Sequence, residues 1–294
     1  MKKTLILALG FAAIALSAAT PAASTMGKAR VYRPERYAFA EKTDIYNGEN
    51  RYTFTIVQSK PAGTQAPRTQ FWLAAPKNGF SALVNFFKMK VNGIDYSNLT
   101  PRPNDMKLWK NGTSAGCEVK MNFDGAKFIL RFYMREDSPV LWGSIRPAED
   151  SVEDVETAEI TFSALVSHLA KDANKKVMWS DAYERMAITP ARTLMQRRPA
   201  YLLTPADTRL VLQDKKFDGS APDKGEGPVM IILDHNGVEK AELFLRNEWT
   251  TSLCLKLKKD FKEFRFGLWQ PTTRVSNAGL AGKLEKEAAK FTLR

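Results

Sequence analysis

Two aspartates are the residues of this sequence best suited to catalysis. Asp207 lies just before a predicted strand, and Asp218 begins an Asp-Gly-Ser triplet. A pair of carboxylates can hydrolyse a glycosidic bond, or can share a proton and activate water. The same residues fit simpler roles, Asp207 as a loop or capping acid and Asp218 as a turn residue. Whether the protein is an enzyme stays open at this point.

Other catalytic systems are disfavoured by what the chain lacks. His168 and His235 are its only histidines, whereas catalytic zinc sites usually need two or three and a Ser-His-Asp system needs one well-placed base. Gly-x-Ser-x-Gly, His-Glu-x-x-His, phosphate-binding loops and Cys-x-x-Cys are also missing. These absences argue against serine hydrolases, zinc proteases, nucleotide-binding enzymes and thiol oxidoreductases. We expect no metal and no cofactor.

Lysines and arginines favour binding over catalysis. Such side chains recognise sulfate, phosphate and carboxylate groups. We expect the binding surface to consist of eight residues in two groups: Lys256, Lys258, Lys259, Lys262 and Arg265, then Arg192, Arg197 and Arg198. The first group gathers on one sheet face if strands 252–258 and 264–269 form a hairpin through the short 259–263 connection. The alternative is an ordinary solvated, lysine-rich face.

The overall charge supports an anionic partner. The formal net charge is +12, although six acids and no base occupy residues 149–159. A basic excess of this size raises the local concentration of anions. Aromatic residues interleave only modestly with the bases, so any nucleic acid would be held through sequence-independent contacts.

Three functions follow as hypotheses. The first is binding of anionic polymers, with acidic glycans or mucin-type glycoprotein as partners and nucleic acid as a second possibility. The second is a carboxylate-dependent, aspartic-type hydrolase of polysaccharide or glycoprotein that uses Asp207 and Asp218. The third is a structural component of the cell envelope that joins partners through strand edges. The oligomeric state is left open.

The first residues predict export. Two lysines precede an apolar run from Leu5 to Leu16, and small residues follow, which is the pattern of a signal peptide over residues 1–24. We expect cleavage between Ala19 and Ser24 and a periplasmic or secreted product without a membrane-spanning segment. Export would permit a disulfide between the only cysteines, but Cys117 fits an inward strand face and Cys254 an outward one. The disulfide is therefore left open.

Turn signals set the fold class. Seven Asn-Gly or Asp-Gly dipeptides separate short alternating segments, and such dipeptides favour tight hairpin turns. Residues 118–134 predict one hairpin around Asp124-Gly125, and residues 229–245 predict another around Asp234–Gly237. Many short strands at regular spacing indicate a mainly β protein, a large antiparallel β-sandwich. Two similar halves packed together would also explain the pattern.

The domain organisation follows from composition. We expect an N-terminal sandwich half over residues 25–148, an acidic linker over 149–159 and a C-terminal half over 160–294. An α-helix should close the chain, because Leu280, Leu284, Ala288 and Phe291 fall on one face of a helix that Ser276 or Asn277 can cap.

Four segments carry a resemblance: residues 160–163 (Ile-Thr-Phe-Ser), 225–233 (Gly-Glu-Gly-Pro-Val-Met-Ile-Ile-Leu), 264–269 (Phe-Arg-Phe-Gly-Leu-Trp) and 276–278 (Ser-Asn-Ala). Through them, the chain from about Ile160 onward resembles uncharacterised exported proteins of Gram-negative bacteria associated with mucus or polysaccharide. The resemblance covers less than half of the chain. It implies a large antiparallel sandwich in a polysaccharide-rich setting, and it supplies no activity and no catalytic residues.

Overall fold

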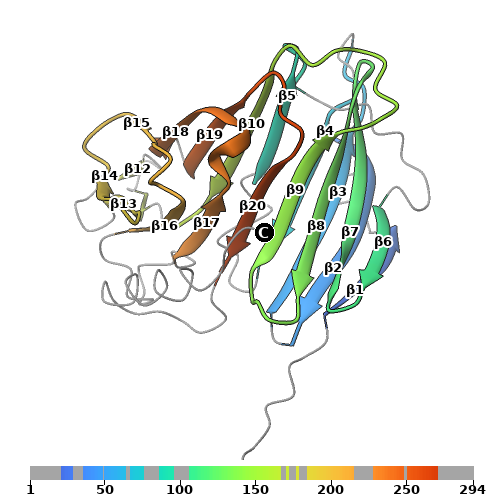
Figure 1. Cartoon of the computed structure of the whole chain (residues 1–294), viewed down its shortest axis with the longest axis horizontal. Coiled ribbons are helices and arrows are strands. Elements are labelled where there is room, and N and C mark those ends of the chain that lie inside the picture. Colours follow the sequence, from blue (N-terminus) through green and yellow to red (C-terminus); the bar gives the residue numbers. More distant parts are fainter. Residues whose placement is uncertain are drawn as a thin grey trace, which may run out of the picture.

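The chain folds mainly into antiparallel β-structure. The computed structural model describes residues 21–28, 36–48, 50–63, 67–75, 86–95, 106–166, 170–171, 177–178, 184–214, 228–247 and 250–270. Two nine-stranded sheets pack face to face as a β-sandwich (Figure 1). No helix in the described part of the chain is long and apolar enough to cross a membrane.

The first sheet contains nine strands, each antiparallel to its neighbours. Their spatial order is β1 (Ala22–Lys28), β2 (Tyr37–Asn47), β3 (Asn50–Ser59), β4 (Thr69–Ala74), β5 (Phe87–Val91), β10 (Ala158–Ala164), β19 (Thr250–Leu257), β18 (Val238–Asn247) and β15 (Tyr201–Leu202).

The second sheet is also antiparallel throughout. Its spatial order is β14 (Thr193–Met195), β13 (Arg185–Ile188), β16 (Arg209–Asp214), β17 (Val229–Leu233), β20 (Phe264–Trp269), β9 (Leu141–Pro147), β8 (Ala126–Arg135), β7 (Ser114–Phe123) and β6 (Met106–Asn111). Two short elements complete the described structure: the strand pair β11 (Ala170–Lys171) and β12 (Val177–Met178), and the 3-10 turn η3 (His235–Gly237).

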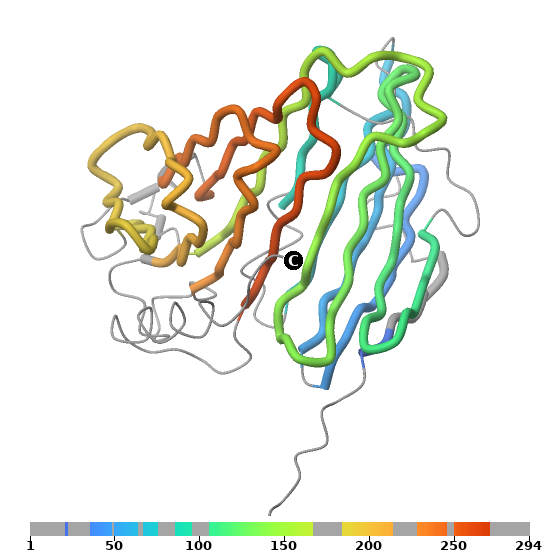
Figure 2. The backbone as a smooth tube through the Cα atoms, in the orientation of Figure 1, coloured from blue at the N-terminus to red at the C-terminus, as the bar shows by residue number. Residues whose placement is uncertain are grey.

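Each sheet is shared by the two halves of the chain. Strands β2 to β9 lie on one side of the molecule and strands from β10 onward on the other (Figure 2). The halves join edge to edge through the β5–β10 pair in the first sheet and the β9–β20 pair in the second. The predicted linker is the stretch where the chain passes from one half to the other. Whether each half is a domain in its own right stays a prediction.

Side-chain alternation fixes which face of each strand is buried. Along β8 every second residue from Ala126 to Met134 is buried, as expected for a strand with one face on the core. The predicted β7–β8 hairpin is confirmed, and Asp124 and Gly125 both adopt positive φ, which suits the tight turn between twisted strands.

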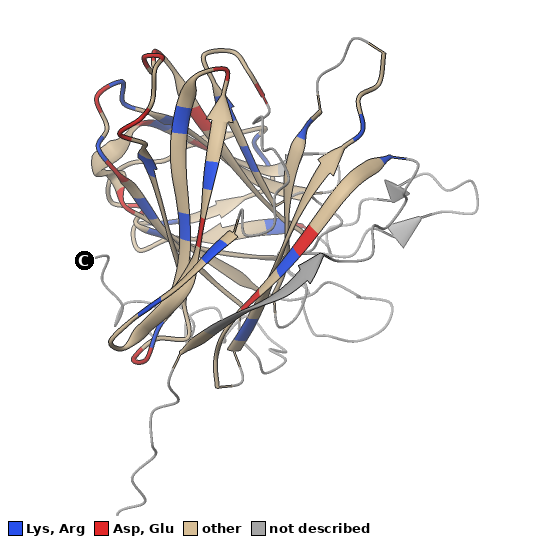
Figure 3. Cartoon of the chain, turned by 90° about the vertical axis from the view of Figure 1, so that its right-hand side faces the viewer, with Lys and Arg blue, Asp and Glu red and all other residues tan. Residues whose placement is uncertain are grey.

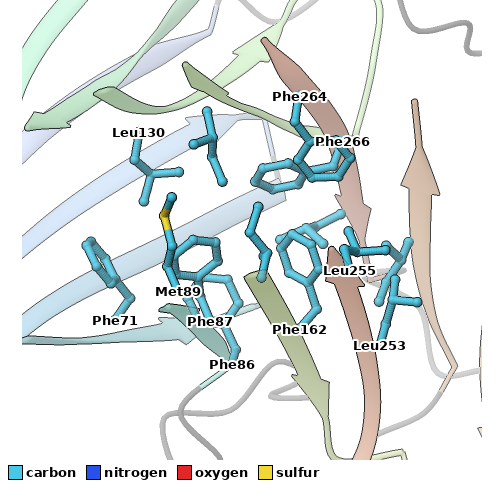
Figure 4. Packing of buried hydrophobic residues seen from close by; sticks show 14 of the residues in the cluster. Phe71, Phe86, Phe87, Met89, Leu130, Phe162, Leu253, Leu255, Phe264 and Phe266 are labelled. Atoms are coloured by element: carbon cyan, nitrogen blue, oxygen red, sulfur yellow. The ribbon is translucent and has the colours of Figure 1, made fainter. Parts of the chain in front are cut away.

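Aromatic rings from both sheets fill the space between them. Figure 4 shows Leu130 and Phe266 of the second sheet pointing toward Met89 and Phe162 of the first, respectively. The ring centroids of Phe162 and Phe266 lie 4.8 Å apart at the junction of the halves. Such pairs add directional attraction to the large apolar area that they bury.

The predicted hairpin over residues 229–245 does not form, so that prediction was wrong, and the hairpin considered for strands 252–258 and 264–269 does not form either. β17 belongs to the second sheet and β18 to the first, so the 234–237 turn crosses between sheets. β19 and β20 are divided in the same way, and the 258–263 connection crosses back. The two crossings lie together, because the Lys258 amide donates to the Gly237 carbonyl at 3.0 Å. Turn residues specify a reversal, but they do not specify which sheet receives the next strand.

Three other expectations concern the termini and the cysteines. Cys117 is buried on β7 and Cys254 is partly exposed on β19, and both are free thiols, in agreement with their opposite strand phases. Burial raises the pKa of the Cys117 thiol to about 12. The C-terminal helix and most of the signal peptide lie outside the described residues. β1 begins at Ala22, before the expected start of the N-terminal half.

Replacing Gly143 with alanine should destabilise the sandwich by about 1–3 kcal/mol, because an added methyl group would overpack the junction. A Cβ at Gly143 would lie 2.2 Å from Cζ of Phe266. Urea unfolding followed by circular dichroism measures the change. Gly237→Ala is the matched control, since its nearest neighbour would be a carbonyl oxygen at 3.3 Å and the cost should be about 0.5 kcal/mol. Equal losses in both variants would contradict this packing.

If the first residues act as a signal peptide, the cleaved bond should lie on the N-terminal side of Ala22. Ala22 is paired with Tyr46 and Ala23 with Ile45, so later cleavage would remove part of the β1–β2 ladder. N-terminal sequencing of the exported protein tests this. A mature chain that begins at Thr25 would show that β1 does not need its first residues.

Candidate functional site

The expected cluster of cations around β19 and β20 is divided between the two sheets. Lys256 is partly exposed on the outer side of the first sheet, and Arg265 on that of the second. Lys258, Lys259 and Lys262 lie near the connection that crosses between them. These residues therefore do not share one sheet face, contrary to the hairpin prediction. Figure 3 shows basic positions spread over the strands with acidic positions between them.

Most of these cations are also neutralised by an acid. Nζ of Lys256 lies 2.8 Å from Glu239, and Nζ of Lys259 lies 2.6 Å from Glu156. Arg265 contacts Asp234 at 3.2 Å. Among the described residues, Lys258 and Lys262 have no ion pair, and both are exposed.

The second group of cations is divided between structural and solvent-exposed roles. Arg192 forms an ion pair with Asp207, and Nε of Arg197 lies 3.7 Å from Glu184. Arg198 lies with its guanidinium 5.9 Å from the Tyr201 ring centroid and is exposed. The three arginines are near one another in sequence, and among the described residues only Arg198 of the three has no ion pair.

The side chain of Asp207 is fully buried, and both oxygens of its carboxylate accept hydrogen bonds. It accepts hydrogen bonds from Thr189 Oγ1 at 2.7 Å, from Arg192 Nη2 at 2.8 Å and from the Thr204 amide at 2.9 Å. Burial favours a higher pKa, but the hydrogen bonds from Arg192, Thr204 and Thr189 outweigh it and lower the pKa to about 2. This arrangement ties two turns together. Asp218 lies outside the described residues, so the carboxylate pair stays a prediction.

The acidic segment folds back on basic residues of the sandwich. Asp150 contacts Nζ of Lys120 at 2.5 Å and Nζ of Lys127 at 3.1 Å. These two lysines hold the pKa of the exposed Asp150 carboxyl at about 2. Together with the Glu156–Lys259 pair, these contacts remove much of the local charge excess at this end of the molecule.

A different surface, on the outer face of the second sheet, combines aromatic rings with an unneutralised cation. Register places Trp109, Gly116, Tyr133 and Trp142 side by side on four adjacent strands. Gly116 leaves room for its neighbours, since a Cβ there would lie 2.7 Å from Cβ of Tyr133. The rings of Trp109 and Tyr133 consequently reach each other across β7, with centroids 5.8 Å apart.

Arg131 stacks on this pair of rings. Its Cζ lies 3.6 Å from the centroid of the Trp109 ring and 5.6 Å from that of Tyr133. Among the described residues, no carboxylate lies within ion-pair distance of it, and its Nε is buried without an acceptor. Cation–π attraction holds the planar guanidinium in one orientation. We call Trp109, Arg131 and Tyr133 the Arg131 stack.

Polar residues border the Arg131 stack in the next row of the sheet. The register across five strands is Lys107, Glu118, Arg131, Ser144 and Arg265. Burial raises the pKa of Tyr133, against the opposing effect of Arg131. This face thus presents two partly buried rings, a stacked guanidinium and the partly exposed Glu118 carboxylate at neighbouring positions of the sheet.

Sequence reasoning missed the Arg131 stack because its members are far apart in the chain. One signal was available: Arg131 and Tyr133 take the outward phase of a strand whose inward positions are Leu130, Phe132 and Met134. The absence of an acid partner cannot be read from a sequence.

Comparison with known proteins adds a distant likeness of fold. Neither a protein-family model nor a curated protein matches the chain. Among solved structures, the GH36 alpha-galactosidase AgaB from Geobacillus stearothermophilus is similar with a TM-score of 0.39 and 10% identity, over 85% of this chain and 41% of that chain. The chain thus spans less than half the length of that enzyme. The resemblance to exported proteins from Ile160 onward stays a prediction.

Replacing Asp207 with asparagine should destabilise the fold by about 2 kcal/mol at pH 7, because the folded pKa lies near 2 instead of 3.8. The carboxylate contributes this stability above the unfolded pKa and loses it as the pH falls through about 2. Urea unfolding at several pH values should therefore show the gap between wild type and variant closing in acid.

Asp150→Asn is the matched control for this experiment. Its pKa is lowered to a similar value, but its carboxylate is exposed and screened by water, so the substitution should change stability little. A pH-independent effect of Asp207→Asn would contradict the role of the ion pair.

Proposed function

We propose that the protein binds acidic glycans on the outer face of the second sheet, at the Arg131 stack. One observation carries the proposal: the Arg131 guanidinium lies 3.6 Å above the Trp109 ring and has no acid partner among the described residues. A guanidinium that is stacked, partly buried and not held in an ion pair by a described carboxylate is available to an anionic ligand.

The chemistry of the stack suits a sugar that carries a carboxylate or sulfate. An arginine fork donates two parallel hydrogen bonds to such a group, and stacking reduces the freedom that it loses on binding. The exposed parts of the Trp109 and Tyr133 rings offer apolar surface, beside the guanidinium, to the C–H face of a sugar ring. The partly exposed Glu118 carboxylate, which is opposite Arg131 in the register, can accept hydrogen bonds from hydroxyl groups.

This proposal narrows the expectation of a general polyanion-binding surface. Five of the eight expected cations, Arg192, Arg197, Lys256, Lys259 and Arg265, contact an acid. Such pairs leave little free charge for a long polymer to follow, and nucleic-acid binding would need a continuous basic groove. A discrete site that reads one acidic group and its sugar fits the described surface better.

The geometry favours neither rival function. A hydrolase that uses Asp207 would need that carboxylate to reach a substrate, whereas it is fully buried and hydrogen-bonded. The role of an envelope component that joins partners at strand edges stays a hypothesis, as do export and the periplasmic or secreted location.

Arg131→Ala and Trp109→Ala should each weaken binding to heparin or polygalacturonate by about tenfold or more, because a charge-assisted contact contributes about 1.5–3 kcal/mol and each tenfold is about 1.4 kcal/mol. Binding should weaken as salt rises from roughly 0.1 to 0.5 M, because added ions screen the contact between Arg131 and the acidic group. Isothermal titration calorimetry at two salt concentrations measures both effects.

Lys256→Ala is the matched control, since this lysine is on the other sheet and is already paired with Glu239. It should leave glycan affinity nearly unchanged. An equal loss in Lys256→Ala, undiminished binding at high salt, or tighter binding of DNA than of either glycan would overturn the proposal.

A further inference from the structure

A second apolar cluster lies on the outer face of the second sheet, opposite the main core. On β17 the side chains of Val229, Ile231 and Leu233 belong to the main core, whereas Met230 and Ile232 belong to this second cluster. The same alternation holds on β16, β20 and β9. We call the following residues the outer cluster: Val140, Trp142, Val211, Met230, Ile232 and Trp269.

The outer cluster is covered. Its six side chains are between 0% and 9% exposed, and Trp142 is only 3% exposed. A sheet face turned to water would leave tryptophan largely accessible, so a further layer must lie over it. Among the described residues, the partly buried hydrophobic side chains that pack against the cluster are Tyr133 and Ile188, which belong to the same sheet.

We propose that residues 276–291 of this chain dock on the outer cluster as an amphipathic helix. The chain leaves the described part at Gln270, directly after Trp269, so the next segment starts at the cluster itself. Its sequence places Leu280, Leu284 and Ala288 on one helical face. A helix with such a stripe gains most of its stability by packing it against an apolar partner.

The dimensions of the two surfaces agree. The stripe from Leu280 to Phe291 spans about 16 Å at about 1.5 Å per residue. The outer cluster extends over β16, β17, β20 and β9, and these four strands span about 14 Å at about 4.8 Å spacing. Residues 215–227 offer only Phe217 as a large apolar side chain, so they carry less apolar surface than the stripe of residues 280–291.

Docking would also define one border of the Arg131 stack. Trp142 is in register with Tyr133, so the aromatic row continues from the stack into the outer cluster. Tyr133 packs against that cluster while Trp109 is partly exposed. The helix would therefore cover the aromatic row as far as Tyr133. It would leave the rest of the Arg131 stack accessible beside it. The docking itself does not depend on glycan binding.

Leu284→Asp in the full chain should release the helix. Acrylamide quenching of tryptophan fluorescence should rise, because Trp142 and Trp269 become accessible, and amide hydrogen exchange over residues 276–291 should accelerate by at least tenfold. The melting temperature should fall by about 5 °C or more. Lys286→Asp is the matched control, because it places the same residue on the opposite helix face and should change none of the three measurements.

Two further variants keep the test decisive. Leu284→Ala should produce a smaller change in the same direction, and it replaces Leu284→Asp if that variant does not fold. Phe217→Asp should leave quenching unchanged. Rapid exchange of residues 276–291 in the wild type would overturn the proposal. If quenching rises with Phe217→Asp instead, residues 215–227 cover the cluster. If quenching falls as the protein concentration is raised and a dimer forms, a second copy of the chain covers it.

Discussion

The packing of Phe266 at the junction of the halves holds the rest of the structure in place. Its ring lies against the bare backbone of Gly143 on β9 and packs on Phe162 of the first sheet and Phe132 of the second. Because close-packed interiors tolerate little change of volume, this contact keeps β9 and β20 in one register. Both sheets are continuous across the halves, and every row on their outer faces depends on that continuity.

The outer face of the second sheet changes character along its width. β17 is an unbroken apolar run, which is typical of a strand buried on both faces, whereas β8 alternates and has one face partly open. The transition falls between Tyr133 and Trp142. On one side of it lies the Arg131 stack, and on the other lies the outer cluster. One sheet can therefore support a further layer of protein and a binding surface next to each other.

The sequence predicted the fold class and many strands correctly, because alternation and turn chemistry act locally. β20 has the predicted bounds, and the Asp124-Gly125 hairpin is present. It did not predict that the chain crosses between sheets at 234–237 and 258–263, because the choice of sheet depends on partners far away in sequence. The cations expected together on one sheet face are divided between the sheets for the same reason. The Arg131 stack depends on β6 and β8 lying on either side of β7, which only the register reveals.

Net charge and a binding surface are separate properties in this protein. Hydrogen bonds to the backbone of the 149–159 segment position its acids near lysines. The Val152 amide donates to the Gly125 carbonyl, and the Asn92 side chain donates to the Asp154 carbonyl and accepts from the Glu156 amide. The chain stays strongly basic, and long-range attraction still accelerates the encounter with an anion. Retention after the encounter depends on short-range contacts and governs the dissociation rate. It therefore requires a cation that no acid has already engaged, and the stacking of Arg131 on Trp109 preserves one.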